Sequence, residues 1–330
     1  MFNTYALKTA GLTQSFSGSV TPDSATTLAQ ALWIDLLEPT VDEEHAVERA
    51  LGIDVPTREE MREIESSNRL YEEEGALYLT TTLVTRLDTS QPQSAQITFI
   101  LKNGRLITNR YTDPLPFRRY VTYAERHPTT CNTHVAIFAG LVESMVNRIA
   151  DVVERVGSDL DAISADIFAR GGGHRQRLGQ RDYRAVLERI GQCGELIAKT
   201  RESLVSIGRT LAFAQQSTVL QIPNDVRTRL RTVSRDVIAM SDHASFLGNN
   251  VSFMLDATLG MINIDQNNIL KIFSVVTVFL LPPSVIGAVF GMNFDRIPGA
   301  HDPWGFAVAV GVMVLSAIVP WLLFKWRGWL

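Results

Sequence analysis

Cysteine is scarce in this chain, which has two in 330 residues. Cys131 and Cys193 lie far apart, and neither belongs to a CxxC or Cys/His pair. This pattern excludes a disulfide scaffold, and we expect two free thiols in a reducing compartment. The N-terminal stretch MFNTYALKTAGLTQSFSG has no basic start followed by an apolar core. It therefore does not resemble a signal peptide.

Motifs of the common enzyme classes are also missing. The sequence contains no HExxH, no GxSxG, no P-loop and no Rossmann glycine pattern. The six histidines are scattered, without metal-ligand spacing on one helix, and we expect surface positions for them: His45, His127, His134, His174, His243 and His301. The 31 basic and 35 acidic residues show no basic cluster, which argues against nucleic acid. We predict that the chain is not an enzyme.

Charge is absent from two stretches, residues 272–291 and 305–324. Each is roughly twenty residues, long enough for a helix to cross a hydrocarbon core. The alternative is a pair of buried helices in a soluble domain, but soluble helices of this length rarely lack charge on every face. We therefore predict transmembrane helices at 272–291 and 305–325, an external loop at 292–304 and a tail at 326–330.

The flanking charges predict the orientation of this hairpin. Its outer ends carry three cationic residues: Lys271, Lys325 and Arg327. The connecting segment holds only Arg296, beside Asp295 and Asp302. The excess of positive charge places both termini in the cytoplasm, with membrane lipid around the hairpin. Tryptophans at the boundaries fit interfacial anchors: Trp304, Trp326 and Trp329.

Residues 1–133 predict a cytoplasmic α+β domain, a mixed sheet with helices. Residues 32–39, LWIDLLEP, are typical of a buried strand closed by proline. Two capping boxes, Thr40 with Glu43 and Thr57 with Glu60, predict short helices, the first ending at Gly52. Residues 75–84 and 95–111 predict strands, the second pair joined by an Asn103-Gly104 hairpin turn.

Residues 134–271 predict long cytoplasmic helices and a stalk. Apolar residues recur every three or four positions over residues 134–170, and GGGHRQ (171–176) then breaks the helix. We interpret this break as a helix-hairpin turn rather than a phosphate loop, because no GK[ST] follows it. A return helix runs to about Gln216. A third helix, capped by Asn224, meets no proline before Pro282 and enters the membrane as one rod.

The first apolar stretch carries a narrow polar face. Ser274, Thr277 and Ser284 fall within an arc of roughly 80° on a helix. Alternating steps of three and four extend this face into a pore stripe: Asn267, Leu270, Ser274, Thr277, Leu281, Ser284 and Ala288. Hydroxyls that hold two membrane helices together are the alternative. We favour a pore lined by several copies because the stripe is continuous. Pro282-Pro283 predicts a bend, with hydroxyls satisfying the freed carbonyls.

These residues carry a family resemblance. The stretch NIDQNNILKIFSVVTVFLLPPSVIGAVFGMNF, the ending KWRGWL and the early LWIDLLEPT resemble the CorA family of divalent-metal transport proteins, in the two-transmembrane GxN superfamily. The resemblance implies a funnel-shaped homopentamer in the bacterial inner membrane, with the first span lining a central pore. It also implies Mg²⁺ uptake, with Co²⁺ or Ni²⁺ admitted, and closure by cytoplasmic Mg²⁺ bound between subunits.

The same resemblance implies a filter at Gly291, Met292 and Asn293. Mg²⁺ keeps several of its waters, and a ring of neutral Asn293 oxygens suits hydrogen bonds to them. Asp295 and Asp302 would attract cations to the external loop. We further expect rings of the two stripe leucines to close the pore by excluding water.

Alternatives from the same residues stay open. Residues 297–300, IPGA, replace the Met-Pro-Glu-Leu segment usual in close CorA relatives and resemble the zinc-transporting ZntB branch. A membrane-tethered sensor or scaffold that conducts nothing is a third hypothesis, and channel-like and proton-coupled transport both remain. Four acids are candidate regulatory metal ligands, although solvated helix faces explain them equally well: Asp159, Asp161, Asp236 and Asp242.

Overall fold

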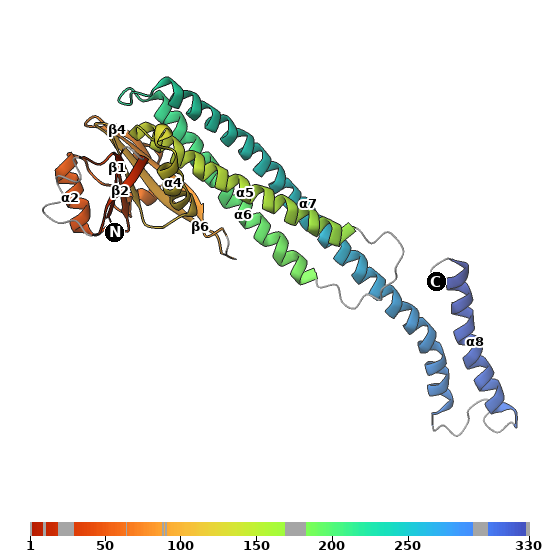
Figure 1. The fold of residues 1–330 in the computed structure, drawn as a ribbon. Helices are drawn as coiled ribbons and strands as arrows, with labels where there is room; N and C mark the ends of the chain where they lie inside the picture. Colours follow the sequence, from red (N-terminus) through yellow and green to blue (C-terminus); the bar gives the residue numbers. More distant parts are fainter. Residues whose placement is uncertain are drawn as a thin grey trace. The chain divides into compact units, whose positions relative to one another are not determined.

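The computed structural model describes residues 2–8, 11–18, 30–63, 65–87, 89, 91–168, 183–292 and 303–327. The chain forms two compact units, Met1–Leu255 and Asp256–Leu330. Figure 1 shows a sheet with helices in the first unit and two helical segments in the second. The elements are β1 (Phe2–Lys8), β2 (Gly11–Gly18), β3 (Trp33–Leu37), α2 (Val41–Leu51), η1 (Glu60–Arg62), α3 (Ser66–Arg69), β4 (Leu70–Glu73), β5 (Ala76–Thr85), β6 (Gln93–Lys102), β7 (Arg105–Arg110), α4 (Leu115–Arg126), η2 (Pro128–Thr130), α5 (His134–Phe168), α6 (Tyr183–Gln216), α7 (Asn224–Phe290) and α8 (Gly305–Trp326).

The seven strands form one sheet in the order β2-β1-β3-β7-β6-β5-β4. Only the central pair, β3 and β7, is parallel, and the other pairs are antiparallel. The predicted α+β class is therefore confirmed. The mixture follows from the connections: short turns join β4 to β5 and β6 to β7, whereas β3 reaches β7 only after most of the sheet has been built.

Two local predictions are confirmed at the residues that carry them. Thr40 Oγ1 accepts from the Glu43 amide at 3.3 Å, Glu43 Oε2 accepts from the Thr40 amide at 3.1 Å, and α2 ends at Gly52 with φ 62°. Asn103 and Gly104 have φ 48° and 77°, as a two-residue turn between antiparallel strands requires.

Other local features differ from the expectation. The Thr57–Glu60 bonds form, at 2.8 and 3.4 Å, but they start only the single 3₁₀ turn of η1, because the chain is extended at Glu63. Strands β1, β2 and β4 were not predicted. In β1 the polar residues Asn3 and Thr4 are adjacent and both buried, next to the buried Phe2. The sequence therefore lacks the alternation of polar and apolar residues that marks a half-buried strand.

Helices cover both faces of the sheet. On one face, Trp33 lies against Phe117 and Tyr120 of α4, and Phe99 meets Phe138 of α5 edge to face. The other face carries a cluster that includes Val47 of α2, which Figure 1 shows on the opposite side of the sheet from α4. The sheet is thus the middle layer of three.

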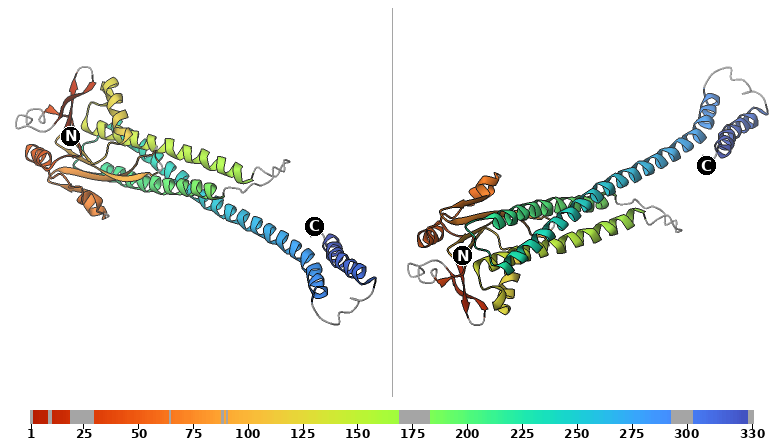
Figure 2. Two further views of the ribbon diagram at one scale, coloured as in Figure 1. Left: turned by 90° about the horizontal axis from the view of Figure 1, so that it is seen from below. Right: turned by 90° about the horizontal axis from the view of Figure 1, so that it is seen from above.

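Three long helices complete the first unit. Figure 2 shows α5, α6 and the first half of α7 running side by side. Small residues allow close approach: a Cβ added at Gly208 would lie 3.4 Å from Val237, and one added at Gly194 would lie 3.2 Å from Val251. Helix α5 ends at Phe168, close to the predicted break, and residues 171–176 lie outside the described residues.

Helix α7 is one continuous helix of 67 residues that begins at Asn224. It stays helical through Pro282 and Pro283 to Phe290. The prediction of a single rod as far as Pro282 is therefore confirmed, and the helix extends beyond that point. The second unit contains its C-terminal part and α8, which continues through Pro320.

Candidate functional site

The predicted pore stripe forms one exposed face of α7. Leu270 and Leu281 are 62% and 59% exposed. All seven residues of the stripe are exposed: Asn267, Leu270, Ser274, Thr277, Leu281, Ser284 and Ala288. Because every member lies on one uninterrupted helix, the three-and-four spacing places them along one line.

The stripe hydroxyls bond to the backbone of their own helix. Ser274 Oγ donates to Leu270 O at 2.8 Å and Thr277 Oγ1 donates to Phe273 O at 2.8 Å. Ser284 Oγ donates to Leu280 O at 2.6 Å. This pattern lets a helix carry hydroxyls in an apolar solvent without an unpaired donor.

One detail of the expectation about the prolines is wrong. Pro282 and Pro283 have no amide hydrogen for the carbonyls of Val278 and Phe279. Ser284 Oγ donates instead to Leu280, whose carbonyl is one turn before the serine itself. A serine hydroxyl bonds most easily to the carbonyl of the fourth residue before it. For Ser284 this is Leu280, so the hydroxyl does not reach back as far as the freed carbonyls.

Helix α8 packs on the side of α7 opposite the stripe. A Cβ added at Gly287 would lie 3.3 Å from Met313 Cε. The less exposed residues of α7 form this contact side: Val275, Phe279, Pro282, Pro283, Ile286 and Gly287. At about 100° per residue they lie across the helix from the stripe. The stripe hydroxyls therefore do not join the two helices of one chain.

The end of α7 holds two of the three predicted filter residues. The Gly291 amide donates to Gly287 O at 2.9 Å and the Met292 amide donates to Val289 O at 3.4 Å, so the helical bonding continues to this point. A Cβ on Gly291 would lie 3.2 Å from Gly287 O. Met292 is 47% exposed. Asn293, Asp295 and Asp302 lie outside the described residues.

The four candidate regulatory acids are exposed and separate. Asp159 and Asp161 lie on α5, and Asp236 and Asp242 lie on α7. Among the described residues, no three His, Cys, Asp or Glu side chains come close enough to hold a metal ion. Asp159 lies beside a cavity that Arg155 and Arg189 also line. Among the described residues of one chain, then, these acids do not assemble a complete metal site.

The two predicted free thiols, Cys131 and Cys193, are both buried and unpaired with each other. Burial raises the pKa of the Cys193 thiol, and Asp159 raises it further, whereas Arg189 lowers it. Cys131 accepts a hydrogen bond from Tyr120 Oη at 3.3 Å. Both therefore behave as core residues.

Two helices, α7 and α8, are long and apolar enough to cross a membrane. Almost none of the most apolar part of either helix is buried. Trp304 and Trp326, at the two ends of α8, are 76% and 84% exposed, and Lys325 lies over the Trp321 ring at 5.0 Å. Exposed apolar helices bounded by aromatic and cationic side chains are typical of a bilayer environment.

Comparisons with known proteins extend over nearly the whole chain. The family model of the CorA-like Mg²⁺ transporter protein matches residues 29–326. The magnesium transport protein CorA of Mannheimia succiniciproducens is 30% identical, with both chains covered fully.

Two solved structures share the fold. The CorA magnesium transporter of Methanocaldococcus jannaschii superposes with a TM-score of 0.77 at 17% identity, over 100% of this chain and 99% of the other. The ZntB cytoplasmic domain of Vibrio parahaemolyticus superposes with a TM-score of 0.51 at 11% identity, over 80% of this chain and 98% of the other. From the family match, the end-to-end similarity and the helical hairpin, we conclude that this chain belongs to the CorA-like Mg²⁺ transporter family.

Proposed function

We propose that this chain carries Mg²⁺ across the bacterial inner membrane through a pore made by five copies. The observation that carries the proposal is the stripe on α7: a continuous line of polar and small residues, with Leu270 and Leu281 among them. It is exposed among the described residues and lies on the side of α7 opposite α8. A lone hairpin encloses no path, so such a face needs other copies. We take Mg²⁺ as the transported ion because the similar proteins are named magnesium transport proteins.

The proposal also assigns an orientation and a filter. Lys271, Lys325 and Arg327 favour the cytoplasmic side for both termini, since positive residues are retained there. Asn293 would stand at the outer mouth, where its neutral oxygens accept hydrogen bonds from the waters that Mg²⁺ keeps. Co²⁺ and Ni²⁺ are secondary cargoes, and Mg²⁺ bound between subunits closes the pore.

Flux into liposomes tests transport directly. Purified protein is reconstituted into liposomes that enclose a dye sensitive to divalent cations. Mg²⁺, Co²⁺, Ni²⁺ and Zn²⁺ are then added outside the liposomes in separate runs. We expect Mg²⁺ entry. Zn²⁺ entry without Mg²⁺ entry would favour the ZntB-like alternative, and absence of all flux would favour a sensor or scaffold.

A thiol-blocking experiment tests the stripe itself. Thr277→Cys and Val276→Cys are adjacent substitutions on different faces of α7, and both native residues are exposed. A charged, thiol-specific methanethiosulfonate reagent should block flux through the Thr277→Cys protein and leave the Val276→Cys and unsubstituted proteins unchanged. Equal block of the two variants, or none in either, would show that this face does not line the path.

A further inference from the structure

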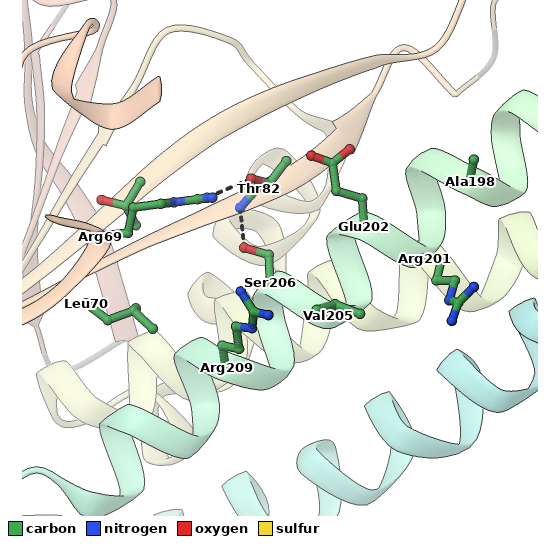
Figure 3. Close-up of a pocket in the computed structure, with 10 residues that line it drawn as sticks. Arg69, Leu70, Thr82, Ala198, Arg201, Glu202, Val205, Ser206 and Arg209 are labelled. Carbon is green, nitrogen blue, oxygen red and sulfur yellow. Dashed lines mark hydrogen bonds between the residues drawn. The ribbon is translucent and has the colours of Figure 1, made fainter. Parts of the chain in front are cut away.

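A cavity of about 510 Å³ lies between the sheet and α6 within the first unit, and it opens to the surface. Figure 3 shows its lining, which comes from the end of α3, the start of β4, from β5 and from α6. Among the described residues, the charged side chains that line it are three arginines and one glutamate: Arg69, Arg201, Arg209 and Glu202. The cavity is therefore cationic, in a chain whose formal net charge is −4.

Two hydrogen-bond donors of residues that line this cavity have no acceptor among the described residues. Arg69 Nη2 donates to Thr82 Oγ1 at 2.7 Å, but the Arg69 Nε–H is buried and unpartnered. Ser206 Oγ accepts from the Thr82 amide at 2.8 Å and from Thr81 Oγ1 at 3.2 Å. A hydroxyl that accepts twice still has its own hydrogen to donate.

The three arginines are spread along the cavity, and Glu202 lies among them. In Figure 3, Arg69 and Arg209 lie on either side of Ser206, and the Arg201 guanidinium points away from Thr82 at the far end. Ser94 Oγ donates to Glu202 Oε2 at 3.2 Å, which holds that carboxylate toward β6. Burial lowers the pKa of the Arg69 guanidinium, Glu202 raises it, and Arg209 lowers it again, so the net direction is downward.

We propose that this cavity binds a phosphate-bearing anion, either free phosphate or a phosphate ester. Arg69 and Arg209 present planar N–H groups that match phosphate oxygens in pairs, and the Ser206 hydroxyl lies between them. A cavity of this volume accommodates a small phosphorylated molecule. Arg201 belongs to the rim. The inference does not depend on transport, because every group it uses lies in the first unit.

Calorimetric titration of the full chain in detergent, without Mg²⁺, tests the site with inorganic pyrophosphate as the probe. We expect saturable binding that weakens as salt rises. Arg69→Gln and Arg209→Gln should each weaken it about tenfold, as expected for loss of one charge-assisted contact. Arg201→Gln should have a smaller effect. Arg227→Gln, an exposed arginine on α7 outside the cavity, is the matched control and should bind as the parent does.

Further experiments distinguish loss of binding from loss of folding, and a lipid phosphate from a soluble one. Arg69→Lys keeps the charge and loses the planar fork, so it should fold and still bind more weakly than the parent. Competition by nanodiscs that contain phosphatidylglycerol would identify the source as a lipid headgroup, and no competition would identify a soluble phosphate. Absence of saturable binding by the parent overturns the proposal, as does equal weakening by Arg227→Gln. If the parent shows no saturable binding and Arg209→Gln dissociates the assembly into monomers, the arginines form a contact between subunits instead.

Discussion

At the scale of single residues, the most demanding interaction is a buried ion pair in the sheet. Arg110 donates to both carboxylate oxygens of Asp35, at 2.8 and 2.7 Å, and to Asp113 at 2.9 Å. Burial opposes the charge of Arg110, but Asp35 and Asp113 raise its pKa overall. Asp35 also accepts from Thr108, which in turn accepts from Trp33 Nε1. The network fixes the parallel pairing of β3 with β7.

Removal of one partner should therefore be costly. Asp35→Ala leaves a buried guanidinium without its main counterion, and we expect a loss of about 3–5 kcal/mol in the free energy of unfolding. Asp113→Ala is the control, because Asp113 is 41% exposed, and its loss should stay below about 1 kcal/mol. Urea unfolding of the full chain in detergent, followed by tryptophan fluorescence, measures both. Similar losses for the two variants would contradict this account.

A glycine in α5 makes a second prediction at this scale. A Cβ at Gly140 would lie 2.3 Å from Cε2 of Tyr120, a buried ring whose hydroxyl bonds to Cys131. Gly140→Ala should destabilise the protein by about 1–3 kcal/mol through overpacking. Gly191→Ala, in α6 with none of the described residues within 4 Å of the added Cβ, should instead stabilise it by up to about 1 kcal/mol. Thermal or urea unfolding measures the stability of both variants. A change of the same sign in the free energy of unfolding of the two would refute the steric argument.

The proposed filter residue gives the third prediction. Asn293→Ala removes the amide oxygens that would accept from the waters of Mg²⁺, so uptake should be abolished while assembly stays intact. Asp302→Asn removes only a long-range attraction and should weaken uptake chiefly at low ionic strength. Liposome flux with native-gel analysis of assembly measures both. Normal Mg²⁺ flux through the Asn293→Ala protein would place the filter elsewhere.

At the scale of elements, the leucines of the stripe are the large apolar side chains on an otherwise small and polar face. If rings of Leu270 and Leu281 exclude water, Leu270→Ala and Leu281→Ala should raise the basal flux when internal Mg²⁺ is high. Leu280→Ala is the control, because Leu280 is equally exposed, at 62%, but lies on the next face of α7. Unchanged flux in both stripe variants, at equal expression, would remove them from the gate.

Local sequence predicts elements where the signal is local. The Thr40–Glu43 capping box, the Asn103-Gly104 turn and the apolar spacing of α5 each rest on residues within a few positions of one another, and each is confirmed. Strands β1 and β4 depend on partners: consecutive residues of β1 are buried when the sheet is covered, and β4 is a four-residue strand without a buried residue that is defined by its pairing with β5. Such strands are recognised only after the sheet is assembled.

The sites divide in the same way. The stripe follows from helical periodicity, which the sequence contains in full. The arginine-lined cavity does not, because Arg69, Thr82 and Arg209 are distant in sequence and meet only when α6 packs on β5. The bonds of the stripe hydroxyls also depend on side-chain rotamers, which explains the incorrect expectation about the carbonyls freed by the prolines.

At the scale of the whole molecule, the candidate regulatory acids give a prediction about assembly. If these acids share an ion, we expect another copy to complete its site, because all four are exposed: Asp159, Asp161, Asp236 and Asp242. An ion that binds the closed assembly preferentially stabilises it. Millimolar Mg²⁺ should then slow proteolysis of the full chain, and Asp→Ala changes at the true ligands should abolish this protection. Glu188→Ala, an exposed acid on α6, is the control. Identical digestion in EDTA and in Mg²⁺ would contradict the idea.

The stripe hydroxyls of α7 donate to their own helix, and this determines the sign of the partial charge that they present outward. Each of Ser274, Thr277 and Ser284 spends its only hydrogen on a backbone carbonyl, so the outward side of each oxygen offers lone pairs alone. A water bound to a cation turns both hydrogens outward, whereas a water bound to an anion turns one hydrogen inward and exposes its oxygen and at most one hydrogen. In the proposed pore the wall would accept hydrogen bonds from the waters around a cation. It would offer no hydrogen to the exposed oxygens of the waters around an anion. The helix backbone would thus discriminate charge without a charged side chain.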